Sequence, residues 1–252
     1  MMLDRKTVIQ TVKAVLAADL ACDEADFDVD GVSIRQAEIR GGRFRFPIRE
    51  QSLTIVTMGR GVVVSCNRER LEWARQALGN EADGQIFAAR TVGEISAFVQ
   101  RDKQLLAGPD QKYVCSSADL KDFPIPDGIN LVTYKDNDIV GLYRHAAFKH
   151  ALSFRSDSAR SDRIATVAER GGTIIGIAGA SEDCGRMWQI GVDVLPEYQG
   201  MGIGKAIVGT LTKAVLNEGI VPYYTTEVGN LRSRQLAASL GYWPAWIQMY
   251  AR

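Results

Sequence analysis

Glycine alternates with larger side chains at residues 199–204, where the sequence is Gln-Gly-Met-Gly-Ile-Gly. A predicted strand at 187–195 precedes this turn, and a predicted amphipathic helix at 203–217 follows it. Glycine leaves backbone N–H groups uncovered, and the first N–H groups of a helix have no partner within the helix. The pattern therefore predicts a site for phosphate or pyrophosphate at residues 199–205.

Two nucleotide-binding motifs do not fit this turn. A Walker A loop needs one more residue between its glycines than Gly200 and Gly204 provide, and Ala206 stands where the Mg²⁺-binding hydroxyl is required. A dinucleotide motif GxGxxG would end on Lys205 or Ile207 instead of glycine. These mismatches argue against a nucleoside triphosphatase and a dinucleotide enzyme, and a glycine-rich turn without a ligand stays open as the alternative.

The rest of the chain predicts a mixed α/β protein of two domains, 1–122 and 123–252, separated by the Pro- and Gly-containing segment 122–128. In the first domain we expect a helix at 4–20, a hairpin at 53–66, a helix at 68–79 capped by Asn67, a helix beginning at Thr91 with Glu94 completing a capping box, and a strand at 111–116. In the second we expect strands at 129–134, 163–169, 173–180, 221–227 and 246–250, and further helices at 138–152 and 230–240.

Composition limits the possible partners. Thirty Lys and Arg balance thirty Asp and Glu, so bulk charge gives no attraction to nucleic acid or to an anionic membrane. Four cysteines without CxxC spacing, together with two histidines, predict neither a metal site nor a redox motif, and we expect buried thiols. The longest uncharged apolar run near the N-terminus is Ala14–Ala18, so we expect a cytoplasmic protein without a membrane span.

The glycine-rich turn also resembles a family signature. Residues 199–204 match Q/R-x-x-G-x-G/A of the GNAT N-acetyltransferase superfamily, and they follow a strand that ends in Val192-Asp193-Val194. Downstream, Asn230 with Ser233 and Leu240-Gly241-Tyr242 resemble the pattern of the family's fourth helix. The resemblance covers residues 129–252 and implies a GNAT fold with a mixed, mostly antiparallel, splayed sheet, preceded by a smaller mixed α/β domain. More closely, the chain is similar to a two-domain bacterial subgroup that includes the zwittermicin A resistance acetyltransferase.

The resemblance implies that acetyl-CoA is the cosubstrate and that no metal is needed. Its pantetheine arm would pair with the backbone of the strand, the amide of Val194 would polarise the thioester carbonyl, and the pyrophosphate would lie on the glycine-rich turn. The residues implied in binding acetyl-CoA are Val192, Val194, Gln199, Gly200, Met201, Gly202, Ile203, Gly204, Lys205, Asn230 and Ser233.

One position departs from the family. Many members carry a tyrosine that protonates the leaving thiolate four residues before the glycine of Gly-Phe/Tyr, where this chain has Ala237. Tyr224 is our preferred substitute, with Tyr223 and Ser233 as alternatives, and strand alternation directs only one of the two tyrosines into the cleft. Asp193 and Glu227 are the predicted proton acceptors for the amine, and Glu182 is a further candidate; any of the three could act directly or through water.

We therefore expect direct transfer of an acetyl group from acetyl-CoA to a primary amine on an unidentified small-molecule or peptide acceptor. The alternative, motivated by Ala237, is a non-catalytic module that binds acyl-CoA. The sequence leaves the oligomeric state open.

Overall fold

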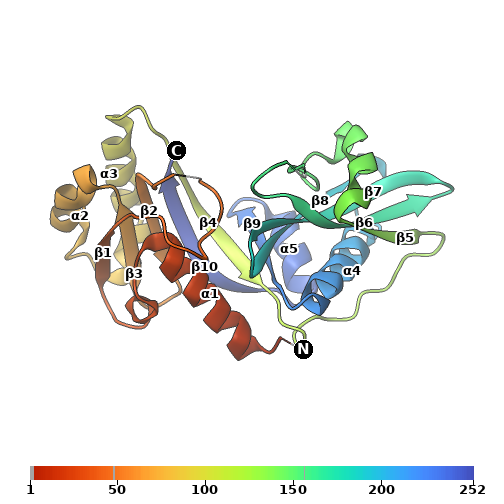
Figure 1. Ribbon diagram of the computed structural model, residues 1–252, viewed down its shortest axis with the longest axis horizontal. Helices are drawn as coiled ribbons and strands as arrows, with labels where there is room; N and C mark the ends of the chain where they lie inside the picture. Colours follow the sequence, from red (N-terminus) through yellow and green to blue (C-terminus); the bar gives the residue numbers. More distant parts are fainter. Residues whose placement is uncertain (1–2, 48, 156) are drawn as a thin grey trace. The chain divides into compact units, whose positions relative to one another are not determined.

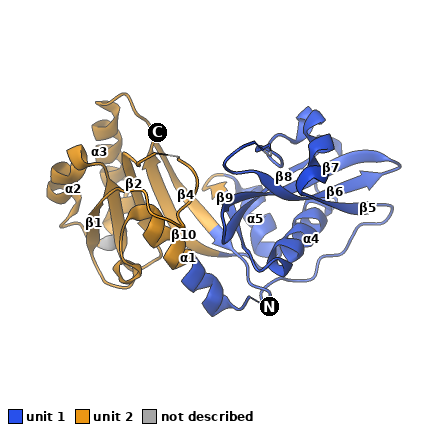
Figure 2. Cartoon of the chain, in the orientation of Figure 1, with its two compact units in different colours: residues 1–11, 113–225, 230–243 blue, residues 12–112, 226–229, 244–252 orange. Residues whose placement is uncertain are grey.

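The computed structural model describes residues 3–47, 49–155 and 157–252, and the chain divides into two units (Figure 2). Unit 1 contains the chain up to Thr11 together with Tyr113–Thr225 and Asn230–Trp243. Unit 2 contains Val12–Lys112, Thr226–Gly229 and Pro244–Arg252. The main division therefore lies between residues 112 and 113, whereas we expected 122 and 123, and the C-terminal segment belongs to unit 2.

Unit 1 is built on a mixed sheet with the strand order β9-β8-β7-β6-β5 (Figure 1). β8 and β9 are parallel, and the other neighbours are antiparallel. The strands are β5 (Asn130–Lys135), β6 (Asp162–Arg170), β7 (Thr173–Cys184), β8 (Met187–Val194) and β9 (Val221–Glu227). The helices are α4 (Ile203–Asn217) and α5 (Leu231–Ser239), with short 3₁₀ segments η4 (Asp136–Arg144), η5 (Ala146–Phe148) and η6 (Pro196–Tyr198). The predicted α/β class is confirmed.

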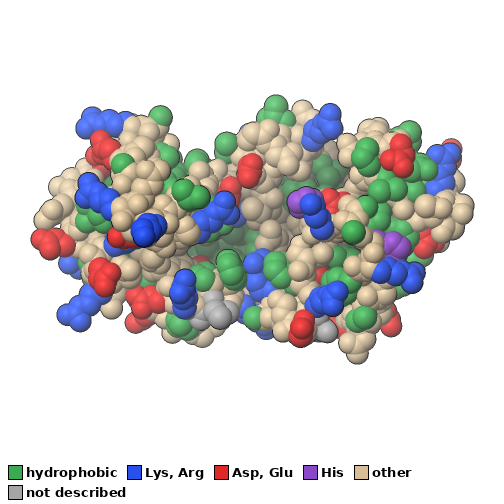
Figure 3. Space-filling view, turned by 90° about the horizontal axis from the view of Figure 1, so that it is seen from above, with side chains coloured by type: hydrophobic (Ala, Val, Ile, Leu, Met, Phe, Trp, Pro, Cys, Tyr) green, Lys and Arg blue, Asp and Glu red, His purple; other side chains and the backbone are tan. Residues whose placement is uncertain are grey.

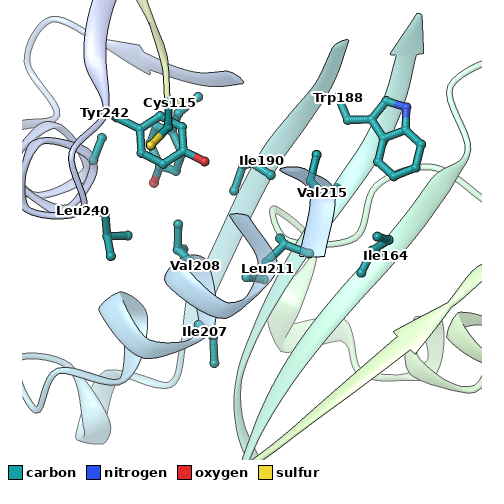
Figure 4. Packing of buried hydrophobic residues seen from close by; sticks show 14 of the residues in the cluster. Cys115, Ile164, Trp188, Ile190, Ile207, Val208, Leu211, Val215, Leu240 and Tyr242 are labelled. Atoms are coloured by element: carbon teal, nitrogen blue, oxygen red, sulfur yellow. The ribbon is translucent and has the colours of Figure 1, made fainter. Parts of the chain in front are cut away.

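Helix α4 packs on this sheet through its apolar side. Val208, Leu211 and Val215 of α4 join Trp188 and Ile190 of β8 in one buried cluster (Figure 4). Burying a side chain of this size contributes about 1.5–3 kcal/mol. The packing therefore holds α4 firmly, and it fixes the helix N-terminus close behind the end of β8.

The predicted helix at 138–152 is wrong. This stretch forms η4 and η5, with irregular backbone at His145 (φ −89°, ψ 84°) between them. Tertiary hydrogen bonds hold the segment instead: the Tyr143 hydroxyl donates to Phe154 O (2.7 Å), and the N–H of Ala151 donates to the carboxylate of Asp193 (2.9 Å). Such long-range bonds override a helical pattern that sequence alone suggests.

Unit 2 has the strand order β1-β3-β2-β10-β4. Its apolar cluster joins the hairpin strands β2 and β3 with side chains of α2 and α3. The strands are β1 (Val32–Gln36), β2 (Leu53–Thr57), β3 (Val62–Cys66), β4 (Leu106–Val114) and β10 (Trp243–Ala251). The helices are α1 (Arg5–Leu20), which belongs to unit 2 from Val12 onward, α2 (Leu71–Leu78) and α3 (Ala89–Gln100), with 3₁₀ segments η1 (Glu24–Phe27), η2 (Arg68–Arg70) and η3 (Asp83–Phe87).

Two predicted helix caps in unit 2 are wrong. Asn67 precedes η2 without a capping hydrogen bond from its side chain, and its Oδ1 is buried without a partner in the described part of the chain. α3 begins at Ala89, so Thr91 lies inside the helix, and Glu94 pairs with Arg90 (3.1 Å) one turn earlier. An i,i+4 ion pair competes with a capping box for the same acidic side chain.

Candidate functional site

Strands β8 and β9 separate halfway along β8. Their parallel pairing runs from Met187↔Val221 to Ile190↔Tyr224, whereas β8 itself continues to Val194. Among the pairs that the structure describes, residues 191–194 of β8 have partners in β7 but none in β9. One edge of β8 is therefore open from Gly191 onward.

The backbone groups of Val192 and Val194 point to this open edge. The N–H of Leu195 donates to Ile175 O (2.9 Å), and residue pairs in an antiparallel ladder alternate between bonded and non-bonded types. The register pairs Val194↔Gly176 and Val192↔Ala178 are consequently of the non-bonded type. Their N–H and C=O groups turn away from β7. An extended ligand can pair there as an additional strand with both N–H groups and with the C=O of Val192, since the C=O of Val194 accepts from Gln199.

The turn at 199–204 presents a second set of backbone donors. Gly200 (φ +80°) and Gly202 (φ +82°) adopt left-handed backbone conformations that disfavour other residues. In α4 the first helical hydrogen bond comes from Ala206, whose N–H donates to Gly202 O (3.1 Å). The three preceding N–H groups, of residues 203–205, have no acceptor in the described part of the chain. An anion can bind there.

Gln199 ties the turn to the neighbouring elements. Its Nε2 donates to Val194 O at the end of β8 (3.2 Å), and its Oε1 accepts from Arg232 in the first turn of α5 (3.3 Å). Gln199 thus links the strand edge, the turn and α5, and Arg232 brings a positive charge to the turn. Sequence reasoning missed Arg232, although its position next to the Asn230 motif gave a signal.

Asn230 and Ser233 begin α5. Asn230 Oδ1 accepts from the backbone N–H of Ser233 (3.1 Å), which is the N-cap bond that satisfies an otherwise unpaired helix donor. The cap therefore fixes the first turn of α5, which carries Ser233.

The adjacent tyrosines of β9 have different surroundings, as strand alternation predicts. Tyr223 donates to Asp183 and to Gln189 Oε1 (3.2 Å), within a buried network around Arg160. Tyr224 is 3% exposed, and its ring packs edge-on against Tyr242. Burial raises the pKa of the Tyr224 hydroxyl, and the charge of Asp193 raises it further, whereas the nearby Ser233 side chain lowers it. Tyr224 is therefore protonated at neutral pH.

The carboxylate of Asp193 is held on one side and open on the other. Its Oδ2 accepts from the backbone N–H groups of His150 (2.7 Å) and Ala151 (2.9 Å). Its Oδ1 has no hydrogen-bond partner in the described ranges, and the side chain is half-buried. A fixed carboxylate with one free oxygen can accept a proton or bind an ammonium group.

Glu227 and Ala237 are the two remaining positions that the sequence analysis singled out. Glu227 ends β9 as an exposed residue of unit 2, whereas the other predicted site residues belong to unit 1. Ala237 is fully buried in the cluster that also contains Tyr224 and Tyr242. The position of the family's usual tyrosine is therefore occupied by a buried methyl group that packs in the core and cannot donate a proton.

We also looked at the surface charge, at a pocket and at groups of metal-binding side chains elsewhere in the described residues. Positive and negative side chains are interspersed over the face seen in Figure 3, in keeping with the zero net charge. A pocket of about 510 Å³ near Leu142, His145 and Ile174 contains none of the predicted site residues. Over 3–47, 49–155 and 157–252 there is no cluster of three or more His, Cys, Asp or Glu side chains suited to a metal ion.

Two further expectations from the sequence concern the cysteines and membrane-spanning helices. All four cysteines are buried, as predicted, and burial raises the pKa of Cys115 to about 12. None of the helices in the described ranges has the length and apolar character needed to cross a membrane.

One family model matches part of the chain. The family model for the acetyltransferase (GNAT) family matches residues 140–242. Among curated proteins no match was found.

Three solved structures of GNAT proteins are similar to this chain, each at low sequence identity. One is a GCN5-related N-acetyltransferase-like protein from Streptococcus suis 89/1591, with 16% identity over 65% of this chain and 68% of that chain and a TM-score of 0.46. Another is a GCN5-related N-acetyltransferase from Kribbella flavida, with 14% identity over 61% and 62% and a TM-score of 0.46. A tandem GNAT protein from the clavulanic acid biosynthesis pathway has 14% identity over 63% and 57% and a TM-score of 0.44.

Proposed function

Because the acetyltransferase (GNAT) family model matches residues 140–242, we propose that this chain is a GNAT acyltransferase and that it transfers an acetyl group from acetyl-CoA directly to a primary amine. The observation that carries the proposal is the open edge of β8, where the N–H groups of Val192 and Val194 turn away from β7 beyond the last pair with β9, Ile190↔Tyr224. Unit 1 also contains the buried hydroxyl of Tyr224 and the fixed carboxylate of Asp193.

The residues present fit acetyl-CoA. The pyrophosphate would be held by the N–H groups of residues 203–205 and by the turn that begins at Gln199, with Arg232 adding positive charge. The pantetheine arm would extend along Val192–Val194, and Asn230 would contact its end. Bound there, acetyl-CoA supplies an activated acyl group as a thioester, and the N–H of Val194 would polarise its carbonyl.

Two side chains of the chain would move protons. Asp193, through its free Oδ1, would accept the proton that the amine loses on acylation. Tyr224 would donate its hydroxyl proton to the departing sulfur, since its raised pKa keeps that proton available at neutral pH. Glu227 stays a prediction as an alternative proton acceptor. No covalent enzyme intermediate is needed, because burial raises the pKa of Cys184 and makes its thiol a poor nucleophile.

The acceptor is proposed as a small-molecule or peptide amine in a cytoplasmic setting, and a place in the two-domain subgroup with the zwittermicin A resistance acetyltransferase stays a hypothesis. The alternative function, a non-catalytic module that binds acyl-CoA, is favoured by one observation, the buried Ala237.

Two measurements test the proposal. Calorimetric titration of the full chain with acetyl-CoA should give saturable binding, and steady-state assays with a panel of amines should release free CoA thiol for at least one of them. Binding without turnover for any amine would support the non-catalytic alternative. Absence of binding would overturn both.

A further inference from the structure

The hydroxyl of Thr225 is buried without a hydrogen-bond partner. Its Oγ1 is shielded from solvent and forms no hydrogen bond with any residue that the structure describes, although the side chain as a whole is half-buried. Buried hydroxyls are normally paired, because an unpaired one gives up its hydrogen bonds to water without replacing them. The hydroxyl of Thr225 is therefore available to pair with a ligand.

Thr225 is the first residue of β9 beyond the pairing with β8. The last pair is Ile190↔Tyr224, and a continued ladder would place Thr225 opposite Gly191, which has no side chain. The two strands separate at this level instead. Thr225 therefore borders the opening between β8 and β9, within unit 1.

Thr225 and Asp193 lie on the same face of the sheet. The hydroxyl of Tyr223 donates to Gln189 Oε1 (3.2 Å), so the side chains of these two residues share one face. Alternation along each strand places Thr225 on that face of β9 and Asp193 on that face of β8. A hydroxyl oxygen and a carboxylate therefore flank the opening on the same side, one from each strand.

We propose that Thr225 Oγ1 accepts a hydrogen bond from the amine acceptor and thereby selects primary amines. The inference rests on the proposed function. A neutral primary amine has two N–H groups and one lone pair. With one N–H directed to Asp193 Oδ1 and the other to Thr225 Oγ1, the lone pair is left for the thioester carbon. Asp193 takes the proton of the first N–H as the new C–N bond replaces the C–S bond, whose electron pair leaves with sulfur. The N–H held by Thr225 stays on the amide product.

A secondary amine cannot satisfy both oxygens. If its one N–H points to Asp193, its second carbon substituent lies where the N–H toward Thr225 would be, and the hydroxyl stays buried and unpaired. A site that pairs with a substrate N–H discriminates against analogues that lack this group, because its own polar atom is then left without a partner. Thr225 is thus a specificity-determining residue.

The experiment compares Thr225→Val, Thr225→Ser and Thr166→Val in the full chain. Valine is close to threonine in shape and lacks the hydroxyl. Thr166 is the matched control on β6, because it is fully buried and its hydroxyl is hydrogen-bonded with that of Thr133 (3.3 Å). In denaturant unfolding, Thr225→Val should have a midpoint at least as high as that of the wild type, whereas Thr166→Val should have a lower one.

The kinetic measurements use an amine that the wild type acetylates, together with its N-methyl derivative. Thr225→Val should raise the KM of the primary amine by about 5- to 10-fold, with a smaller change in kcat. The affinity for acetyl-CoA in calorimetry should not change, and Thr225→Ser should keep the wild-type KM. The preference for the primary amine over its N-methyl derivative should fall in Thr225→Val.

The outcomes separate this inference from the proposed function. A lower unfolding midpoint for Thr225→Val, as in Thr166→Val, would mean that the hydroxyl is paired in the free protein, and it would overturn the inference without any assay of activity. With an active wild type, an unchanged KM and an unchanged preference in Thr225→Val would overturn the inference alone. If the wild type acetylates no amine, the proposed function fails and the inference fails with it.

Discussion

Gly179 and Gly191 are register partners on β7 and β8, and the backbone of residues 150–151 crosses directly over both. A Cβ at Gly179 would overlap the carbonyl oxygen of Ala151, and one at Gly191 would overlap that of His150. The same crossing segment donates its N–H groups to Asp193. The glycine pair therefore allows the approach that fixes the Asp193 carboxylate.

Gly191→Ala should destabilise unit 1 and loosen Asp193 together. The new methyl group has to displace backbone, and overpacking of this kind costs typically about 1–3 kcal/mol. Denaturant unfolding followed by tryptophan fluorescence measures the loss. Gly185→Ala is the control, because the turn between β7 and β8 leaves open space around that residue. Equal stability of the two variants would contradict the close crossing.

Gly202→Val should abolish acetyl-CoA binding, because a β-branched residue resists the left-handed backbone that shapes the turn. Gly219→Val is the matched control: Gly219 (φ +76°) lies at the other end of α4 with open space around it. Both variants carry a similar backbone strain, so only the first should lose affinity in calorimetry. Unchanged affinity in a folded Gly202→Val protein would refute the phosphate site. Gly204 differs, since its backbone is not left-handed and a Cβ there would lie 3.7 Å from Val194 and Leu236.

Tyr224→Phe should lower kcat by at least about 10-fold with little change in acetyl-CoA affinity, because it removes the proposed proton donor and keeps the ring. Tyr223→Phe should instead lower stability, since its hydroxyl serves Asp183 and Gln189. With the pKa of Tyr224 raised above its usual 10, activity that needs this proton should persist to high pH in the wild type. Wild-type rates in both variants would exclude both tyrosines as the acid.

Asp162 should make unit 1 less stable as pH rises. Burial raises its pKa from 3.8 to about 6, so the folded state holds the proton that the unfolded chain has already lost between those values. Stability therefore falls from about pH 4 to pH 6, by roughly 3 kcal/mol at most. Asp162→Asn removes the titrating group, and its unfolding free energy relative to wild type should improve over this window.

The control for Asp162 is Asp138→Asn, at an exposed carboxylate of the same unit. Asp19 of unit 2, whose pKa burial also raises to about 6, contributes the same slope to all three proteins and cancels in the differences. If wild type and Asp162→Asn differ by a constant from pH 4 to pH 8, the assignment of the slope to Asp162 is wrong.

A fragment that begins at Pro126 should be poorly soluble. It lacks Tyr113 and Cys115, which are buried in the core of unit 1, and Leu120 and Phe123, which pack against that core. The missing side chains leave apolar surface exposed. Light scattering of the fragment and of the full chain measures the difference. A soluble fragment with full activity would contradict the prediction.

The parts of the molecule that sequence predicted best are governed by local pattern. Helix α4 has the predicted bounds, 203–217, and the turn before it has the left-handed glycines that such a junction requires. The opposite orientations of Tyr223 and Tyr224 follow from strand geometry alone. In each case the deciding interactions lie within a few residues.

The parts that sequence could not predict depend on distant partners. The helical pattern at 138–152 gives way to 3₁₀ segments because Asp193, 43 residues beyond His150, takes backbone N–H groups there. The membership of 244–252 in unit 2 is likewise a tertiary fact.

The position of β10 has a consequence for biosynthesis. In the sheet of unit 2, β10 lies between β2 and β4, although the ribosome makes it long after both. Until residues 243–251 emerge, β2 and β4 have a vacant place between them, and the nascent unit has to wait while the whole of 113–242 is translated. Most of unit 2 is made early, but its sheet is completed only by the last strand. Slower translation of the end of the message, or chaperones that shield strand edges, should therefore change the yield of folded unit 2.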